Sequence, residues 1–209
     1  MKFYDCATAP SPRRARMFIA EKGLNIERID ISIARGEQLT PEFLAINPAG
    51  TLPALITETG AVLSENIAIA TYLEAIAPNP PLLGTNPEEK ALVAQWNAMS
   101  EQQCGMAIAE VLRNTHPKMN NRALPGPHNF TQIPALAERG SARLTTFFET
   151  LNDHLQNTAY LAGAHFSLAD ITCFVMIDFA RVIRREIPHS HVHSLRWFNA
   201  IKKRPSADM

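Results

Sequence analysis

The chain has 209 residues, of which 46% are hydrophobic, which is enough for a large core and more natural for two domains than for one. Its 20 lysines and arginines balance its 20 aspartates and glutamates, so no net charge attracts nucleic acid or an anionic membrane surface. We therefore expect its partner to be a small molecule or another protein.

The cysteines Cys6, Cys104 and Cys173 are scattered and form no CxxC pair. This pattern argues against a disulfide framework or a zinc site and favours a reducing compartment. The N-terminus has no signal-peptide hydrophobic region, and no apolar run is long enough to span a membrane. We expect a cytoplasmic protein without a metal site, in which His189, His191 and His193 are solvated surface residues.

The first part of the chain alternates strand and helix signals. The aromatic residues of 2–6 predict a strand, and isoleucines that alternate with polar residues predict a second strand over 25–33. Between them, Ser11 and Pro12 predict a helix that ends at Gly23, with Ser11 as its N-cap and Pro12 as its first helical residue.

The segment 47–72 carries the features most specific for function. Pro53 cannot donate to a sheet, so it must precede the strand that follows it, and the Leu52–Pro53 bond is a candidate cis peptide. Such a bond would turn the backbone N–H and C=O of Leu52 into open space, where an extended peptide can pair with them. A turn at 58–60 and a second apolar run complete a predicted β-hairpin.

A helix is predicted to open at Ser64, Glu65 and Asn66, which are residue types that favour this position. The unpaired N–H groups of its first turn and the positive end of its dipole would make a seat for a carboxylate. Free backbone groups followed by a carboxylate seat suit a small peptide ligand.

These elements predict an α/β thioredoxin-like N-terminal domain, which is a mixed four-stranded sheet with helices on both faces. We assign it to residues 1–78, followed by a proline-rich linker over 79–86. Residues 87–209 predict an all-helical domain. Its helices are expected over 87–115, 135–155, 171–183 and 190–203, with capping-box spacing between Ser167 and Asp170.

Several motifs occur in the order found in the cytosolic glutathione S-transferase family. They are Arg-x-Arg-x-x-x-Ala-Glu-Lys-Gly at 14–23, Pro-Glu-Phe-Leu-x-x-Asn-Pro-x-Gly at 41–50, Leu-Pro-Ala-Leu at 52–55, Ser-Glu at 64–65, and Tyr-Leu-Ala-Gly at 160–163 through Ser-Leu-Ala-Asp-Ile-Thr at 167–172. The chain resembles this family, and its first 23 residues are most similar to bacterial and fungal members of the yeast Gtt2-like type. The resemblance implies a homodimer that uses glutathione as co-substrate.

The resemblance also implies a glutathione site in the first domain. The backbone of Leu52 beside Pro53 would pair with the cysteinyl part, and Glu65 and Asn66 would hold the γ-glutamyl part. Gln38 would reach the glycyl carboxylate. The alternatives are that Glu65 and Asn66 only open a helix, and that Gln38 is a solvated loop residue.

Stabilising the thiolate of glutathione requires more than the dipole of a helix. A helix N-terminus typically contributes about 0.3–1 kcal/mol, whereas lowering a thiol pKa by about two units requires roughly 2.7 kcal/mol. A donor is therefore needed, but the position at which relatives carry serine falls near Ala9 or Pro10. Ser11 and Thr8 remain as catalytic candidates, although Ser11 is also explained as an N-cap.

Two further residues near this loop have alternative roles. The thiol of Cys6 would form a mixed disulfide with glutathione in a redox enzyme, or it is simply a small buried residue. Arg16 either makes the surroundings of the thiol positive or holds an acidic residue across a dimer interface.

The helix over 87–115 is expected to line the pocket for a small hydrophobic electrophile, unless its residues belong to the core. The residues expected on one face are Gln103, Ala107, Glu110, Val111 and Asn114. We interpret the chain as a glutathione S-transferase of detoxification. The alternatives are a non-catalytic carrier or partner-binding protein, and a glutathione-dependent peroxidase or disulfide reductase. Because the sequence stops soon after Arg204, a final helix over the pocket is expected to be short or absent.

Overall fold

The structure is a computed structural model that describes all 209 residues. It divides into two compact units. The first, which we name the sheet unit, comprises Met1–Pro80 with Pro125–His128 and Met209; the second, the helical unit, comprises Pro81–Leu124 and Asn129–Asp208.

The sheet unit is built on four strands in the order β2-β1-β3-β4. The strands are β1 (Lys2–Asp5), β2 (Glu27–Asp30), β3 (Ala54–Ile56) and β4 (Val62–Leu63). β1 runs parallel to β2 and antiparallel to β3, and β3 forms a hairpin with β4. The predicted mixed four-stranded sheet is therefore confirmed.

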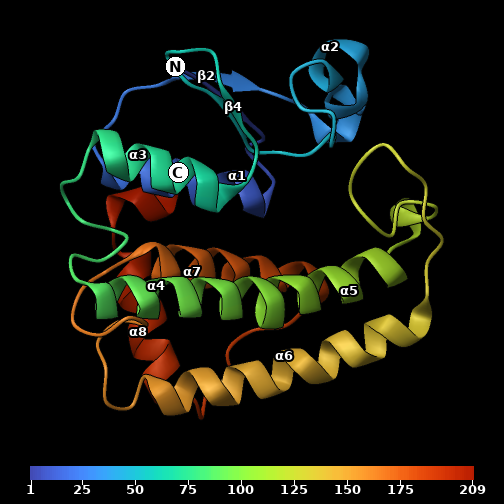
Figure 1. Cartoon of the computed structure of the whole chain (residues 1–209). Coiled ribbons are helices and arrows are strands. Elements are labelled where there is room, and N and C mark those ends of the chain that lie inside the picture. The colour runs from blue at the N-terminus through green and yellow to red at the C-terminus, as the bar shows by residue number, and fades with distance from the viewer. The chain divides into compact units, whose positions relative to one another are not determined.

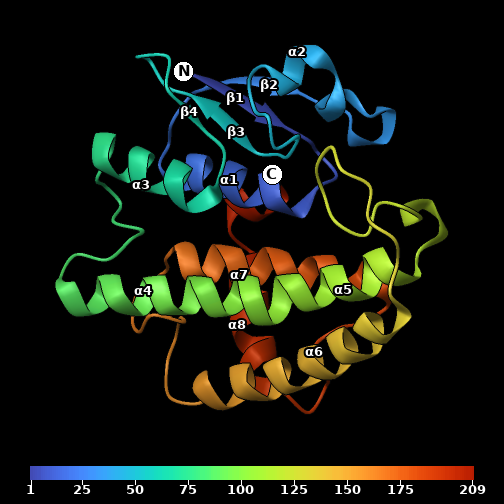
Figure 2. The ribbon, with the colours of Figure 1, turned by 45° about the vertical axis from the view of Figure 1, so that its right-hand side comes forward.

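Helices cover both faces of this sheet. Figures 1 and 2 show α1 (Pro10–Glu21) and α3 (Asn66–Ile76) side by side on one face, with α2 (Pro41–Leu44) on the other side. Between β2 and α2 lie the short 3₁₀ turns η1 (Ile33–Arg35) and η2 (Glu37–Leu39). The layer between the sheet and the two long helices is a closed apolar core, since Phe18, Leu55 and Leu73 are almost fully buried there.

The first helix begins earlier than the sequence predicts. α1 starts at Pro10, its N-cap is Ala9, and no side chain caps it, so the predicted N-cap role of Ser11 is wrong. Proline is favoured in the first turn of a helix, and Pro10 satisfies this preference as well as Pro12 does. The hydroxyl of Ser11 has other partners. The second strand is shorter than predicted, because Ser32 accepts a hydrogen bond from the N–H of Arg35 and turns the chain into η1.

The helical unit contains α4 (Pro87–Met99), α5 (Met106–Thr115), α6 (Pro134–His154), α7 (Leu168–Phe179) and α8 (Val192–Lys202). A π-helical turn, η3 (Ser100–Gly105), joins α4 to α5, so the long helix predicted over 87–115 is continuous but not uniform. Three short 3₁₀ turns complete the unit: η4 (Pro117–Met119), η5 (Ala180–Ile183) and η6 (Pro205–Asp208). None of the helices is both long and apolar enough to cross a membrane.

The start of α7 carries the predicted capping box. The N–H of Ser167 donates to Asp170 Oδ2 over 3.0 Å, and Asp170 Oδ1 accepts from the N–H of Leu161 and from Trp197 Nε1, each over 2.9 Å. Burial raises the pKa of Asp170 to about 6, and these hydrogen bonds oppose that rise. One carboxyl group thus joins the start of α7, the preceding loop and α8.

Candidate functional site

The loop that leads into β3 leaves a free backbone segment. Asn47 shapes this loop, because its Nδ2 donates to the carbonyl of Thr51 over 2.8 Å and its Oδ1 accepts from the N–H of Ala49 over 3.2 Å. The Leu52–Pro53 peptide bond is cis, as predicted. The backbone N–H and C=O of Leu52 have no partner within the protein, although its side chain is buried. They are therefore available to a ligand.

Gln38 is buried beside the same loop. Its side chain is only 4% exposed and its Oε1 has no hydrogen-bond partner, so the alternative of a solvated loop residue is wrong. η2 and the loop approach closely at Gly50, where a Cβ would lie 3.3 Å from the carbonyl oxygen of Gln38. Gly50 also has a positive φ of 60°, which favours glycine.

The first residues of α3 present polar groups that the helix does not use. Glu65 is the N-cap, but its exposed side chain makes no cap hydrogen bond. Asn66 is 5% exposed, and its Oδ1 has no partner. Because buried polar groups are normally hydrogen-bonded, an orphan acceptor at a helix start needs an explanation beyond helix opening.

Ser11 lies next to Asn66 at the start of α1. Its Oγ accepts one hydrogen bond from Asn66 Nδ2 over 3.0 Å and another from Arg14 Nη2 over 3.2 Å. A hydroxyl oxygen has two acceptor positions and one hydrogen. Since both contacts use the oxygen as acceptor, the hydrogen of Ser11 is left to donate elsewhere.

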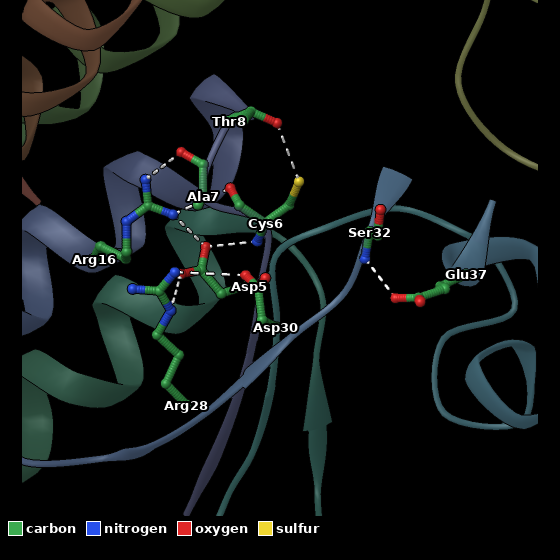
Figure 3. Close-up of polar contacts among 9 residues, drawn as sticks. All are labelled: Asp5, Cys6, Ala7, Thr8, Arg16, Arg28, Asp30, Ser32 and Glu37. Atoms are coloured by element: carbon green, nitrogen blue, oxygen red, sulfur yellow. Dashed lines mark hydrogen bonds and ion pairs between the residues drawn. The ribbon is translucent and has the colours of Figure 1, made fainter. Parts of the chain in front are cut away.

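An ionic cluster fixes the loop between β1 and α1 (Figure 3). Asp5 is fully buried and pairs with Arg16, and its Oδ2 lies 2.6 Å from Arg28 Nε. Arg16 also donates to the carbonyls of Cys6 and Ala7 over 3.1 and 3.2 Å. Arg16 is thus used inside its own chain, which corrects the hypothesis that it reaches across a dimer interface.

Cys6 and Thr8 lie within the loop that this cluster holds. Cys6 is 5% exposed, and its Sγ lies 3.5 Å from Thr8 Oγ1 (Figure 3). Thr8 itself is exposed. Cys6 belongs to the same apolar cluster as Leu52, and Ala9 packs against that cluster. The loop and the free backbone of Leu52 are therefore neighbours.

The predicted face of the long helix is divided by the π-helical turn. Ala107 and Asn114 are buried, and Glu110 pairs with Arg139 at 2.8 Å and Arg143 at 3.0 Å on α6. The core alternative therefore holds for Ala107 and Asn114, whereas Glu110 is half-buried and engaged in ion pairs. Gln103 is exposed and Val111 half-buried. Gln103 lies within the π turn, so the regular 3.6-residue count that related it to Ala107 does not apply there.

Asp5, Arg16 and Asn47 shape the site, yet sequence reasoning gave none of them this role. Two of these residues could have been found from the sequence, because Asn47 lies in the motif at 41–50 and Arg16 in the motif at 14–23. Asp5 had no such signal, because its partners Arg16 and Arg28 come from a helix and a neighbouring strand. No group of three His, Cys, Asp or Glu side chains is arranged to hold a metal ion.

Comparison with known families decides the identity of this architecture. Residues 8–76 match the family model for the glutathione S-transferase N-terminal domain, and residues 134–205 match the model for the glutathione S-transferase C-terminal domain. The chain belongs to the glutathione S-transferase family. The predicted family and its two-part architecture are thereby confirmed.

Other members of the glutathione S-transferase family resemble the chain along nearly its whole length. Glutathione S-transferase 2 of Saccharomyces cerevisiae is 27% identical over 99% of this chain and 87% of its own length. The crystal structure of a glutathione S-transferase domain-containing protein of Marinobacter aquaeolei superposes with a TM-score of 0.91 at 29% identity, covering 99% of each chain. The structure of Gtt2 from Saccharomyces cerevisiae gives a TM-score of 0.90 at 27% identity, with 100% of this chain and 99% of the other covered.

Two relatives carry names from other functional classes. The disulfide-bond oxidoreductase YfcG of Escherichia coli is 27% identical over 96% of this chain and 89% of its own length. Elongation factor 1-gamma 2 of Oryza sativa is 32% identical over 80% of this chain, but the match spans only 38% of that protein. The fold therefore serves catalysis in some relatives and is part of a translation factor in another.

Proposed function

We propose that the protein is a glutathione S-transferase that joins the thiolate of glutathione to small hydrophobic electrophiles. The observation that carries this proposal is a set of unsatisfied polar groups in the sheet unit. Asn66 Oδ1 and Gln38 Oε1 are buried without a partner, and the backbone of Leu52 is unpaired. A bound tripeptide would satisfy them, whereas in the free protein each is costly.

Each part of glutathione has a group suited to it. The exposed carboxylate of Glu65 and the Oδ1 of Asn66 would accept from the γ-glutamyl ammonium, and the first N–H groups of α3 would bind its carboxylate. The backbone of Leu52 beside Pro53 would pair with the cysteinyl residue as a short strand does. Gln38 would contact the glycyl part, where its Oε1 would accept from the backbone N–H and its Nε2 would donate to the carboxylate.

Ser11 is the proposed donor to the thiolate. Its hydrogen is free because Asn66 and Arg14 already occupy the oxygen. A hydrogen bond to a charged group contributes about 1.5–3 kcal/mol, which supplies most of what a helix dipole alone lacks. Thr8 is the second candidate, since it is exposed and lies beside Cys6 at the same loop.

Calorimetric titration with glutathione tests the binding step, and conjugation of several electrophiles tests the reaction. We expect saturable binding, together with catalysis that rises with pH as the bound thiol ionises. The absence of heat on titration would overturn the glutathione site. For substitutions in the glutathione site, Asn157→Ala is a suitable control, because Asn157 is exposed and lies in the helical unit.

A redox function is the second candidate, and the position of Cys6 favours it. Cys6 lies in the apolar cluster that contains Leu52, and no other cysteine belongs to the sheet unit. In this mechanism the thiolate of Cys6 attacks glutathione disulfide, which forms a mixed disulfide and releases one glutathione thiolate. Loss of disulfide or peroxide reduction in Cys6→Ala, with conjugation retained, would assign the redox role.

A carrier or partner-binding role is the third candidate, and the relative among elongation factors supports it. Retention on immobilised glutathione without conjugation of any electrophile would indicate a carrier. No retention at all would indicate a partner-binding protein. Both outcomes would leave the family assignment in place.

We also propose a cytoplasmic homodimer. Both units expose large apolar side chains: Val62 and Ile67 in the sheet unit are 43% and 44% exposed, and Met106 in the helical unit is 50% exposed. Such side chains suit a protein interface, and three free cysteines suit a reducing compartment. Light scattering coupled to size-exclusion chromatography measures the molecular mass of the protein in solution. A monomer at micromolar concentration would contradict the dimer.

A further inference from the structure

A pocket lies wholly within the helical unit, at the junction of α7 and α8. Its volume is about 310 Å³, and its walls come from the end of α7, η5, the segment that follows, and one face of α8. This volume falls at the lower end of the range for small-molecule sites, which is about 300–1,000 Å³. Neither the family comparison nor the proposed transferase chemistry uses this pocket.

The floor of the pocket is apolar and well fixed. Ile177 and Ile187 are buried, while Leu195 and Phe198 are half-buried. The ring of Phe198 packs against Phe174 with centroids 4.8 Å apart, which holds the ring in place. A rigid apolar surface of this size favours an aromatic ring or a short hydrocarbon chain.

One wall carries an oriented cation without an ionic partner. Arg185 Nη1 donates to Ser141 Oγ over 2.9 Å, and its Nη2 donates to Thr145 Oγ1 over 2.7 Å. Both acceptors are neutral hydroxyls of α6, and Arg185 forms no ion pair with any carboxylate. The guanidinium is thus held in one orientation with its charge uncompensated, which prepares it for an anion.

The other charged residues limit the ligand to a single negative charge. Arg181 already pairs with Asp178 at 3.1 Å. Lys202 and Glu186 lie exposed at the rim, as does His189. Three cationic side chains thus face two carboxylates, which leaves one excess positive charge. Glu186 would repel a more highly charged group such as a phosphate.

We propose that this pocket binds a small amphipathic carboxylate of the arylalkanoic acid class. The carboxylate contacts the guanidinium of Arg185 through those N–H groups that Ser141 and Thr145 do not use. The ring lies on Phe198 and Ile187. The fixed cation supplies selectivity for the acid, and the apolar floor supplies affinity.

The test uses the full chain with 3-phenylpropionate and its neutral match, 3-phenylpropionamide. We expect the acid to bind about tenfold more tightly than the amide, because a charge-assisted pair is commonly worth a factor of that order. For so small a ligand the dissociation constant is expected to be about 1 mM. NMR titration follows both ligands and maps the affected backbone amides, which are expected in η5 and α8.

The variant Arg185→Gln removes the positive charge and should abolish the preference for the acid over the amide. Glu186→Gln removes the repelling carboxylate and should tighten binding of the acid. Arg35→Gln is the matched control, because Arg35 is an exposed arginine of the sheet unit and its loss should change nothing.

Equal affinity for the acid and the amide, or perturbed amides outside this pocket, would overturn the proposal. These two measurements need only the unaltered protein, so they decide the matter even if Arg185→Gln folds poorly. None of the readouts involves glutathione, so their outcome is independent of the transferase assignment.

Discussion

Asn66 Nδ2 donates to Ser11 Oγ over 3.0 Å and joins the starts of two helices across 55 residues of sequence. The contact leaves Asn66 with an unsatisfied Oδ1 and Ser11 with an unused hydrogen. The same hydrogen bond therefore orients one group for the proposed γ-glutamyl part and one for the proposed thiolate. Ligand affinity and thiol acidity should be coupled through it.

Replacing Ser11 by Ala should raise the pKa of bound glutathione by about one to two units, because the thiolate loses a donor worth about 1.5–3 kcal/mol. The value of kcat/KM below that pKa should fall about tenfold or more. The pH profile of kcat/KM and ultraviolet titration of the bound thiolate measure the shift. Ser190→Ala, at an exposed serine, is the control. An unchanged profile in Ser11→Ala would transfer the role to Thr8, whose Ala variant is then tested in the same way.

Replacing Asn66 by Ala should weaken glutathione binding about tenfold, since it removes a buried acceptor from the ligand. It should also raise the thiol pKa, because Ser11 loses one of the two groups that orient it. Calorimetry gives the affinity and the pH profile gives the pKa. A change in affinity alone would show that the contact with Ser11 has no part in catalysis.

The pair of Asp5 and Arg16 should contribute more to the stability of the sheet unit than the pair of Asp5 and Arg28. Arg16→Met leaves a fully buried carboxylate with a weaker set of partners, which typically costs about 3–5 kcal/mol. Arg28→Met should cost less, because the Arg28 side chain is 46% exposed and water screens its charge. Denaturant unfolding of each variant gives these values. Equal losses would mean that burial does not set the strength of the two contacts.

Asp170 should make stability depend on pH between about 4 and 6. Its folded pKa is raised to about 6 by burial, above an unfolded value of about 3.9. The folded state therefore binds the proton more tightly, so this contribution is complete below about pH 4 and is lost as the pH rises through about 6. Relative to Asp170→Asn, the unfolding free energy of the natural protein should fall by about 3 kcal/mol across this range. A difference between the two that does not vary with pH would contradict the raised pKa.

Gly140 should tolerate no side chain. A Cβ there would lie 2.6 Å from the carbonyl oxygen of Ala107 and 2.9 Å from Glu110 Cβ, so Gly140→Ala must push α5 and α6 apart. We expect a loss of about 1–3 kcal/mol. Gly105→Ala is the matched control, because a Cβ at Gly105 meets only the flexible side chain of Met176, at 3.1 Å. Thermal unfolding compares the two, and equal effects would show that the close approach at Gly140 is not limiting.

The sequence predicted those parts of the fold that depend on local signals. Pro53 marked the start of β3, and Ser167 with Asp170 marked the start of α7. These are backbone constraints that act over three or four residues. The start of α1 was wrong by two residues, because Pro10 and Pro12 satisfy the same rule and only the partners of Ser11 separate them.

The site was less accessible to sequence reasoning because its geometry depends on contacts between distant residues. The burial of Gln38, the pairing of Asp5 with Arg16, and the contact of Asn66 with Ser11 have no local signature. A charged residue on a helix face looks the same in sequence whether it meets solvent, a partner chain or its own loop. The two alternatives for Arg16, a positive environment for the thiol or a contact across a dimer interface, stayed open for this reason.

The π-helical turn η3 has a consequence for transferring residue roles between relatives. A π turn holds about one residue more than an α-helical turn. Compared with a regular α-helix of the same length, every side chain after it is therefore displaced by about 100° around the helix axis. A relative that keeps a regular helix at this point presents a different side of its α5 at the same sequence offset. An alignment that places this extra residue at another position would pair a solvent-facing residue of one protein with an interior residue of the other. Substrate preferences inferred from that pairing would then concern the wrong side chain.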